Sequence, residues 1–405
     1  MNNLGNYNTV PTDFPALPIP SMSVGFDDGE PILIGSNDPN NEFEALETQM
    51  VSPDLQTPRL QQWSLNTQWE FRPNWLLEVG YIGTKGEHLL QFINQNQAFD
   101  IDALGGFLPR AGVPGGGFIG NYFQVVDDRF VNLRTPPCDL RVTDDCIIAA
   151  ELRGPILGLD EDEGANTLFS NGKSWYNSLQ TSLQRRFSAG YMFNVNYTFS
   201  RAIDYFSDEG IFQIAHDQTR PENNKGLSDF HRKHRLILSW AWDLPFKGNR
   251  FVEGWQIAGI GTLQSGRPFT VTDGTFSSVL VSTEDPRPNL APGMTHEDQT
   301  TKGSVNSRLN NYLNRAAFES SGTAFGNLGR NTVIGPDQRR LDVNVSKMTR
   351  LASGQSLEFR VEAYNVTNTP SFRNPGRDIS SANFGRITRT RGGPRVIQLG
   401  VKFRF

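Results

Sequence analysis

The sequence predicts an all-β fold, an antiparallel up-and-down transmembrane β-barrel of which this chain forms the carboxyl-terminal strands. Three observations carry the prediction: segments in which apolar and polar residues alternate, connections that are alternately short and long, and aromatic residues gathered beside the short connections. A period of two places alternate side chains on opposite faces of a strand. Alternating connections are typical of a membrane barrel with long extracellular loops and short periplasmic turns.

The carboxyl-terminal stretch, residues 395–405, shows the alternation most clearly. One face would carry the apolar residues Ile397, Leu399, Val401, Phe403 and Phe405, and the other the mostly polar residues Val396, Gln398, Gly400, Lys402 and Arg404. The chain then ends on an aromatic residue, which suits a ring placed at the membrane interface. We expect this strand to run from the outer surface to the periplasm.

The other predicted strands form four hairpins before this last strand. They comprise residues 59–71 with 75–81, 174–187 with 191–200, 232–244 with 255–264, and 340–350 with 356–365. Residues 1–58 are rich in Pro, Gly, Asn and Asp and are predicted to be an irregular loop segment, so the barrel segment comprises residues 59–405. The total of about nine strands is odd, whereas single-chain bacterial barrels have even numbers. Either an early strand lies in residues 1–58, or the chain is the carboxyl-terminal piece of a larger barrel.

Composition excludes several classes of protein. No apolar run approaches the ~18 residues that a membrane-spanning helix needs. The net charge is −5 and the basic residues are scattered, so no nucleic-acid partner is expected. No G-x-S-x-G elbow and no Cys/His pair suited to nucleophilic chemistry occurs, so neither an enzyme nor a cofactor is predicted. No apolar, positively charged signal sequence opens the chain, which favours the piece of a larger barrel.

The long connections hold several motifs. Cys138 and Cys146 are spaced for a small disulfide-closed loop, with two free thiols as the alternative. Residues 115–120 match G-x-G-x-x-G but lack the flanking strand and helix of a nucleotide site, so a flexible loop is the better interpretation. The acidic residues 160–163 lack the pattern of a calcium loop and are expected to be solvated. Residues 309–316 have apolar residues at helical spacing, which predicts one short helix.

Aromatic residues beside the short turns predict a girdle at the membrane interface. Its members are Trp69, Phe71, Trp75, Phe187, Tyr191, Trp242 and Trp255, with Phe403 and Phe405 at the same level. The apolar rows contain no central charge, which suits a lipid-facing surface. Arg185 and Arg395 are exceptions near strand ends, where a long side chain can snorkel.

Two groups of polar residues are candidate sites. His231 and His234 are expected on opposite faces, which favours interfacial charge over a metal site. Glu358, Arg360 and Glu362 share one polar face, where paired carboxylates could suggest acid–base catalysis. The simpler interpretation is that the two carboxylates alternate with Arg360 along the wall of the barrel lumen. The same reasoning predicts a lumen-facing position for Gln398, Lys402 and Arg404.

A set of short segments resembles TonB-dependent outer-membrane transporters, in particular the Oar-like group with a carboxypeptidase-regulatory-like domain ahead of the plug. The segments are Gln-Gln-Trp-Ser-Leu at 61–65, Trp-Leu-Leu-Glu-Val-Gly-Tyr-Ile-Gly at 75–83, Trp-Tyr-Asn-Ser-Leu-Gln at 175–180, Tyr-Thr-Phe-Ser at 197–200, Gly-Trp-Gln at 254–256, Ser-Gly-Arg-Pro-Phe at 265–269, Phe-Gly-Asn at 325–327 and Phe-Arg-Val-Glu-Ala-Tyr-Asn-Val-Thr-Asn at 359–368. They occur in order over most of residues 59–405 and are fairly specific as a set.

The resemblance implies energised uptake of a large or scarce substrate across the outer membrane of a Gram-negative bacterium. It further implies a full-length barrel of about 22 strands, filled by a plug domain that contacts the TonB system, and a terminal strand whose Phe403 and Phe405 are read by the barrel-assembly machinery. The other expected partners are the lipid bilayer and a substrate that the sequence does not identify. The alternatives are a self-contained outer-membrane pore or surface adhesin, and a secreted carbohydrate-binding β-sandwich.

Overall fold

A computed structural model describes most of the predicted barrel segment. It covers residues 25–27, 30–32, 49–95, 97, 123–126, 129–132, 166–207, 217, 220–274, 286–321, 325–351 and 354–405. Cys138, Cys146, the glycine-rich residues 115–120 and the acidic residues 160–163 lie outside these ranges. None of the described residues forms a helix long and apolar enough to cross a membrane.

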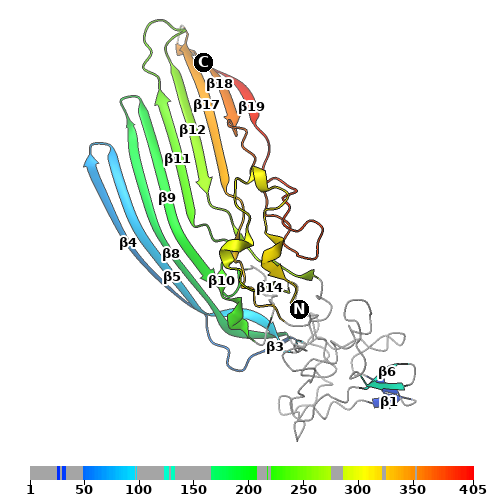
Figure 1. The fold of residues 1–405 in the computed structure, drawn as a ribbon. Helices are drawn as coiled ribbons and strands as arrows, with labels where there is room; N and C mark the ends of the chain where they lie inside the picture. Colours follow the sequence, from blue (N-terminus) through cyan, green and yellow to red (C-terminus); the bar gives the residue numbers. More distant parts are fainter. Residues whose placement is uncertain are drawn as a thin grey trace.

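Nine long strands form one antiparallel sheet in which each strand pairs with the next strand of the meander (Figure 1). In chain order they are β4 (Arg59–Arg72), β5 (Trp75–Asn94), β8 (Asn166–Ser188), β9 (Tyr191–Asp204), β11 (His234–Asp243), β12 (Trp255–Gln264), β17 (Gln338–Arg350), β18 (Ser356–Tyr364) and β19 (Val396–Arg404). The predicted up-and-down fold is thereby confirmed as a partial barrel. The sheet is open in the described part of the chain, with β4 and β19 at its edges.

Short turns lie at one end of the sheet and long connections at the other (Figure 1). Asn74 and Gly190 adopt positive φ in two of the short turns, where Asn and Gly are the residues that tolerate this conformation. At the long-loop end, β5 and β8 extend well beyond their predicted ends. Their pairing is shifted between Gly86 and Leu89 and between Leu89 and Gln91, and such irregularities break the period of two on which the prediction depended.

Several short strands accompany the sheet. β3 (Gln49–Val51) runs parallel to β8, and β10 (Gly226–Leu227) pairs with β9. β1 (Gly25–Asp27) pairs with β2 (Glu30–Ile32), and β6 (Phe123–Val126) pairs with β7 (Arg129–Asn132), each as a separate two-stranded unit. Three of these strands, β1 to β3, therefore lie within residues 1–58.

The register gives the sheet one apolar and one polar face. Residues directly opposite each other in an antiparallel pair share a face. Leu65, Tyr81, Leu179 and Phe199 are successive partners along one apolar row. Such rows stay exposed, and Leu65 keeps 72% of its surface accessible. A continuous apolar face of this size is expected when lipid covers it.

On the opposite face the partners are polar. Ser182 lies between Glu78 and Asn196. Further along the sheet, Glu362 lies between Asn344 and Gln398. Outside the irregular pairing of β5 with β8, the register thus separates mostly apolar from mostly polar side chains, as the alternation predicted.

One close packing contact on the apolar face is testable. The ring of Trp240 covers Gly259, where a Cβ atom would lie 2.4 Å from the ring and 2.8 Å from the carbonyl oxygen of Asp342. We expect Gly259→Ala to lower the free energy of unfolding by about 1–3 kcal/mol, because overpacking forces the ring or backbone to move. Urea unfolding followed by tryptophan fluorescence measures the change. Gly261→Ala is the matched control on the same strand and face, since a Cβ atom there would have its nearest neighbour, in Leu341, 3.8 Å away. Equal losses for both variants would contradict the proposed overlap.

The long connections after β12 and β18 fold together into a compact body, called here the loop unit (residues 265–274, 286–321, 325–337 and 366–395; Figure 1). Its hydrophobic core contains Phe269, Val271, Tyr312, Leu313, Ala317, Phe318, Leu328, Val333 and Ile379. Two small sheets stabilise it: β13 (Pro268–Phe269) with β16 (Val333–Ile334), and β14 (Asn289–Leu290) with β15 (Phe318–Glu319). An isolated bridge between Thr272 and Asp378 joins its two chain segments.

The predicted helix over residues 309–316 is wrong. The chain forms 3₁₀ turns instead, with η6 (Asn306–Arg308) before this stretch and η7 (Arg315–Ala317) at its end. Another short turn, η5 (His296–Gln299), lies earlier in the loop unit, and η3 (Pro221–Asn224) lies between β9 and β11. Between η6 and η7, Leu313 bridges to Thr300 and the hydroxyl of Tyr312 donates to the carbonyl oxygen of Ile334 at 2.9 Å. The apolar spacing therefore reflects burial in the core of the loop unit rather than one helical face.

Candidate functional site

The predicted lumen residues of β18 and β19 form one ion-pair network on the polar face. The guanidinium of Arg360 donates to Glu358 at 2.7 Å and to Glu362 at 3.4 Å. Arg404 donates to Glu358 at 3.2 Å from the neighbouring strand. Both carboxylates therefore have cationic partners, an arrangement that suits a polar wall better than an acid–base pair. Gln398 and Lys402 complete the row, opposite Glu362 and Glu358 respectively.

The predicted girdle residues lie at the short-turn end of the sheet. Ring centroids are 5.6 Å apart for Trp69 and Phe71, and 5.8 Å apart for Phe71 and Trp75. Trp242 is the cross-strand partner of Tyr191. Phe187 and Trp242 are exposed, as rings that meet lipid would be. Trp255 is half-buried, and its indole N–H donates to the carbonyl oxygen of Phe251 at 3.2 Å. The terminal rings of Phe403 and Phe405 lie 6.2 Å apart. Placement of this band at the membrane interface remains a prediction.

The two arginines expected to snorkel are held by local contacts. Arg185 is buried, with its guanidinium 3.3 Å from the ring centroid of Tyr191 and 5.6 Å from that of Trp75. Its Nη1 donates to the carbonyl oxygen of Tyr191 at 2.9 Å. Arg395 precedes β19, and its backbone N–H donates to Asn368. Arg185 thus forms cation–π contacts with two aromatic rings on the apolar face.

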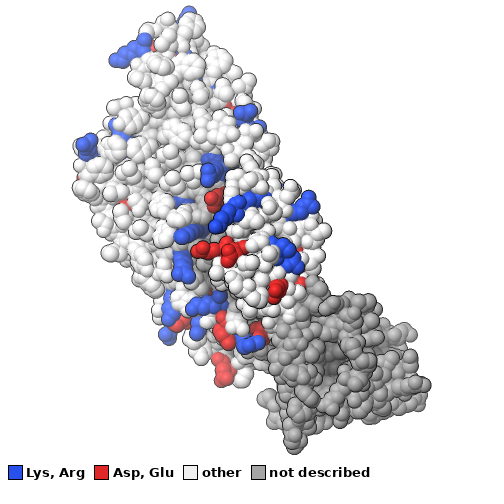
Figure 2. Space-filling model, in the orientation of Figure 1, with Lys and Arg blue, Asp and Glu red and all other residues white. Residues whose placement is uncertain are grey.

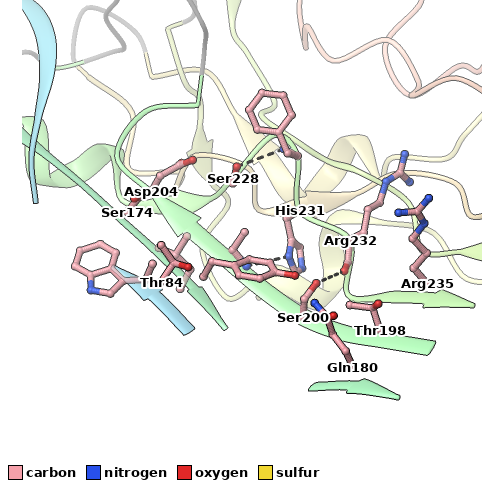
Figure 3. Close-up of a pocket in the computed structure, with 15 residues that line it drawn as sticks. Thr84, Ser174, Gln180, Thr198, Ser200, Asp204, Ser228, His231, Arg232 and Arg235 are labelled. Atoms are coloured by element: carbon pink, nitrogen blue, oxygen red, sulfur yellow. Dashed lines mark hydrogen bonds between the residues drawn. The ribbon is translucent and has the colours of Figure 1, made fainter. Parts of the chain in front are cut away.

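A cavity of about 640 Å³ lies on the polar face toward the long-loop end (Figure 3). The strands β5, β8, β9 and β11 supply most of its wall, and residues 228–232 cover it from one side. The lining side chains combine hydroxyls and amides, aromatic rings and charged groups: Thr84, Ser174, Trp175, Tyr176, Gln180, Thr198, Ser200, Ala202, Ile203, Asp204, Ser228, Phe230, His231, Arg232 and Arg235. Its size is within the range of small-molecule binding sites.

His231 supplies a neutral donor to this cavity. Its Nδ1 accepts the backbone N–H of Ala202 at 3.2 Å, so the neutral ring carries its proton on Nε2. Burial lowers the pKa of His231, and the nearby positive charges of Arg201, Lys233 and Arg232 lower it further. His234 lies elsewhere, with its Nδ1 2.8 Å from the hydroxyl of Tyr197. Among the described residues, no three His, Cys, Asp or Glu side chains gather as metal ligands.

Arg232 is the centre of a basic cluster at the cavity wall. It donates to the carbonyl oxygen of Ser265, which ties the segment before β11 to the start of the loop unit. Burial lowers the pKa of Arg232 to about 10, with further lowering by Arg267, Arg391 and Arg235. The group remains protonated at neutral pH. Charged side chains gather around the loop unit, whereas the sheet surface above it is largely uncharged in this view (Figure 2).

A second network, centred on Arg330, fixes the loop unit beside the cavity. Arg330 forms ion pairs with Asp204, which lines the cavity, and with Asp229. It also donates to Ser207 at 3.2 Å and to the carbonyl oxygen of Asn224 at 2.9 Å. The end of β9 and the segment before β11 therefore share one cation with the loop unit.

Sequence reasoning missed the cavity, the basic cluster around Arg232 and the ion-pair network around Arg330. Arg232 and Arg235 are close in sequence, but Arg267, Arg330 and Arg391 come from distant parts of the long connections. No spacing within a single element brings these groups together. The available signal is the number of arginines in the long connections.

Solved structures of an outer-membrane transporter and of two outer-membrane receptors are similar to part of this chain. The transporter YddB of Escherichia coli is 9% identical with a TM-score of 0.43, and the match covers 88% of this chain and 34% of that one. The ferric preacinetobactin receptor BauA of Acinetobacter baumannii is 10% identical with a TM-score of 0.39, covering 88% and 32%. The pyoverdine receptor FpvA of Pseudomonas aeruginosa is 11% identical with a TM-score of 0.38, covering 87% and 30%. The chain thus spans about a third of the length of these proteins. A search of curated protein sequences finds no match.

A family comparison covers nearly the whole chain. The matching family is described as an outer membrane beta barrel domain, and it matches residues 2–398. This match agrees with the antiparallel meander and with its separate apolar and polar faces, and it confirms the predicted location in the outer membrane. The secreted β-sandwich does not fit, because the nine long strands form a single sheet. The chain belongs to the family of outer membrane β-barrel domains.

Proposed function

We propose that the chain is part of the barrel of a TonB-dependent transporter of the Oar-like group, which takes up a large or scarce substrate across the outer membrane. The observation that carries the proposal is the loop unit, which has its own hydrophobic core and lies against the rim of a cavity on the polar face. A structured unit beside a cavity suits capture of a solute before its passage. The ordered set of segments that resembles this group supports the same function.

The proposed partners follow from the surfaces of the sheet. Lipid would cover the apolar face, and the aromatic band would lie at the headgroup level. The polar face would contact substrate and a plug domain, through which the TonB system supplies energy. The terminal rings of Phe403 and Phe405 would serve the barrel-assembly machinery. The chemistry is selective passage, without covalent catalysis.

Uptake measurements test this proposal in the source bacterium. Radiolabelled solutes are offered to cells with and without the gene, each with and without a protonophore. Energised transport predicts gene-dependent uptake that disappears when the proton-motive force is lost. Gene-dependent uptake that survives the protonophore would show a passive pore instead, and binding of cells to a surface without any uptake would show an adhesin.

A further inference from the structure

Four arginines converge where the loop unit meets the cavity. Arg232 and Arg235 line the cavity and extend from the same side of it in Figure 3. Arg267 and Arg391 belong to the loop unit. The carbonyl oxygen of Ser265, two residues before Arg267, accepts a hydrogen bond from Arg232. The positive charges of Arg267 and Arg391 both lower the pKa of Arg232. These four residues, Arg232, Arg235, Arg267 and Arg391, are called here the arginine cluster.

Carboxylates within the described residues do not neutralise the arginine cluster. No ion pair within 4.0 Å joins any of its members to a described Asp or Glu side chain, whereas Arg330 and Arg360 each have two such pairs. The negative charge of Asp337 acts on Arg232 and raises its pKa, but less than each of the three arginines lowers it. The Oδ1 of Asp337 accepts the backbone N–H of Gly266 at 3.1 Å. The cluster therefore keeps an excess of positive charge at the cavity rim, and like charges held together favour the binding of an anion.

The remaining cavity wall suits an organic molecule rather than a bare ion. Tyr176 and Phe230 supply flat apolar surface, and the hydroxyls of Thr198 and Ser200 supply hydrogen-bonding groups. His231 adds a neutral N–H donor. A few polar groups among aromatic surface are typical of sites that fix the orientation of a small ligand.

We propose that the arginine cluster binds the oxyanion group of an anionic organic solute, a carboxylate or a phosphate, while the uncharged part of that solute occupies the cavity. Guanidinium groups bind both oxyanions through paired N–H donors. Three members of the cluster are exposed and would contact the incoming anion: Arg235, Arg267 and Arg391. Arg232 is half-buried and would contribute positive charge at the cavity wall. The role of this solute as the transported substrate rests on the proposed function, but the binding site does not.

Titration calorimetry on the purified full chain in detergent tests the site. The probes are benzene-1,3,5-tricarboxylate, inorganic pyrophosphate, and the uncharged benzene-1,3,5-tricarboxamide. We expect saturable binding of at least one anion and none of the triamide, and the two anions distinguish a carboxylate site from a phosphate site. Binding should weaken about tenfold for each of Arg235→Gln and Arg267→Gln, because each removes a charge-assisted contact.

Arg250→Gln is the matched control, since Arg250 is an exposed arginine in the short connection between β11 and β12. Its affinity should equal that of the unchanged chain, and circular dichroism should show the same β-structure in all variants. The site is overturned if neither anion binds, if the triamide binds equally well, or if the control weakens binding as much as the cluster variants. Anion binding without gene-dependent uptake would instead overturn the transport function and leave the site standing.

Discussion

Replacing Arg330 with methionine is expected to lower the free energy of unfolding by about 3–5 kcal/mol, because the substitution leaves a buried carboxylate without its cation. The side chains of Arg330 and Asp204 are only 11% and 10% exposed in their ion pair. The substitution would also remove the hydrogen bonds to Ser207 and to the carbonyl oxygen of Asn224. Urea unfolding measures the loss, and limited proteolysis should show cleavage within the loop unit before the sheet unfolds.

Arg340→Met is the matched control for this prediction. Arg340 pairs with Asp342 at 2.9 Å, but its side chain is 54% exposed, and exposed pairs contribute about 0–1 kcal/mol. The double variant Arg330→Met with Asp204→Asn should regain part of the lost stability, because the buried charge disappears with its partner. A loss at position 330 no larger than that at position 340 would contradict a role of Arg330 in fixing the loop unit.

The strands were predictable because the local alternation matches the two faces of the sheet. In β9 and β19 successive side chains point alternately to the lipid-facing and to the polar face of the sheet. The sequence of these strands therefore shows a period of two. The network of Glu358, Arg360 and Glu362 was also accessible to sequence reasoning, since alternate residues of one strand share a face. Strand ends were less predictable where bulges near Gly86 and Leu89 shift the pairing.

The loop unit and the cavity were not predictable from local pattern. Tyr312 and Leu313 are buried by residues as distant as Phe269 and Ile379, so their spacing carries no helical meaning. The arginine cluster likewise combines segments that meet only after the long connections have packed together. Local sequence specifies secondary structure, whereas a site built from several loops depends on contacts between residues far apart in the chain.

Deleting Phe405 is expected to reduce the amount of protein in the outer membrane severalfold while leaving the stability of the folded sheet unchanged. Phe405 follows the last residue of β19 and is 98% exposed, so its ring adds little packing. The pairing of Arg404 with Ser356 does not involve it. A loss of protein from the membrane without a loss of stability would therefore indicate that the terminal ring is recognised during assembly.

Phe405→Ser separates the ring from the position of the terminal carboxylate, and it should lower membrane levels as the deletion does. Phe251→Ala is the matched control, because Phe251 is also an exposed aromatic, 73% accessible, in the short connection between β11 and β12. Quantitative immunoblots of outer-membrane fractions give the levels, and urea unfolding of the purified variants gives the stabilities. If both variants of Phe405 insert as well as the unchanged chain, the terminal ring is not an assembly signal. If Phe251→Ala lowers membrane levels equally, the effect belongs to exposed aromatic residues in general, because recognition of the terminal strand would spare a ring in the turn between two other strands.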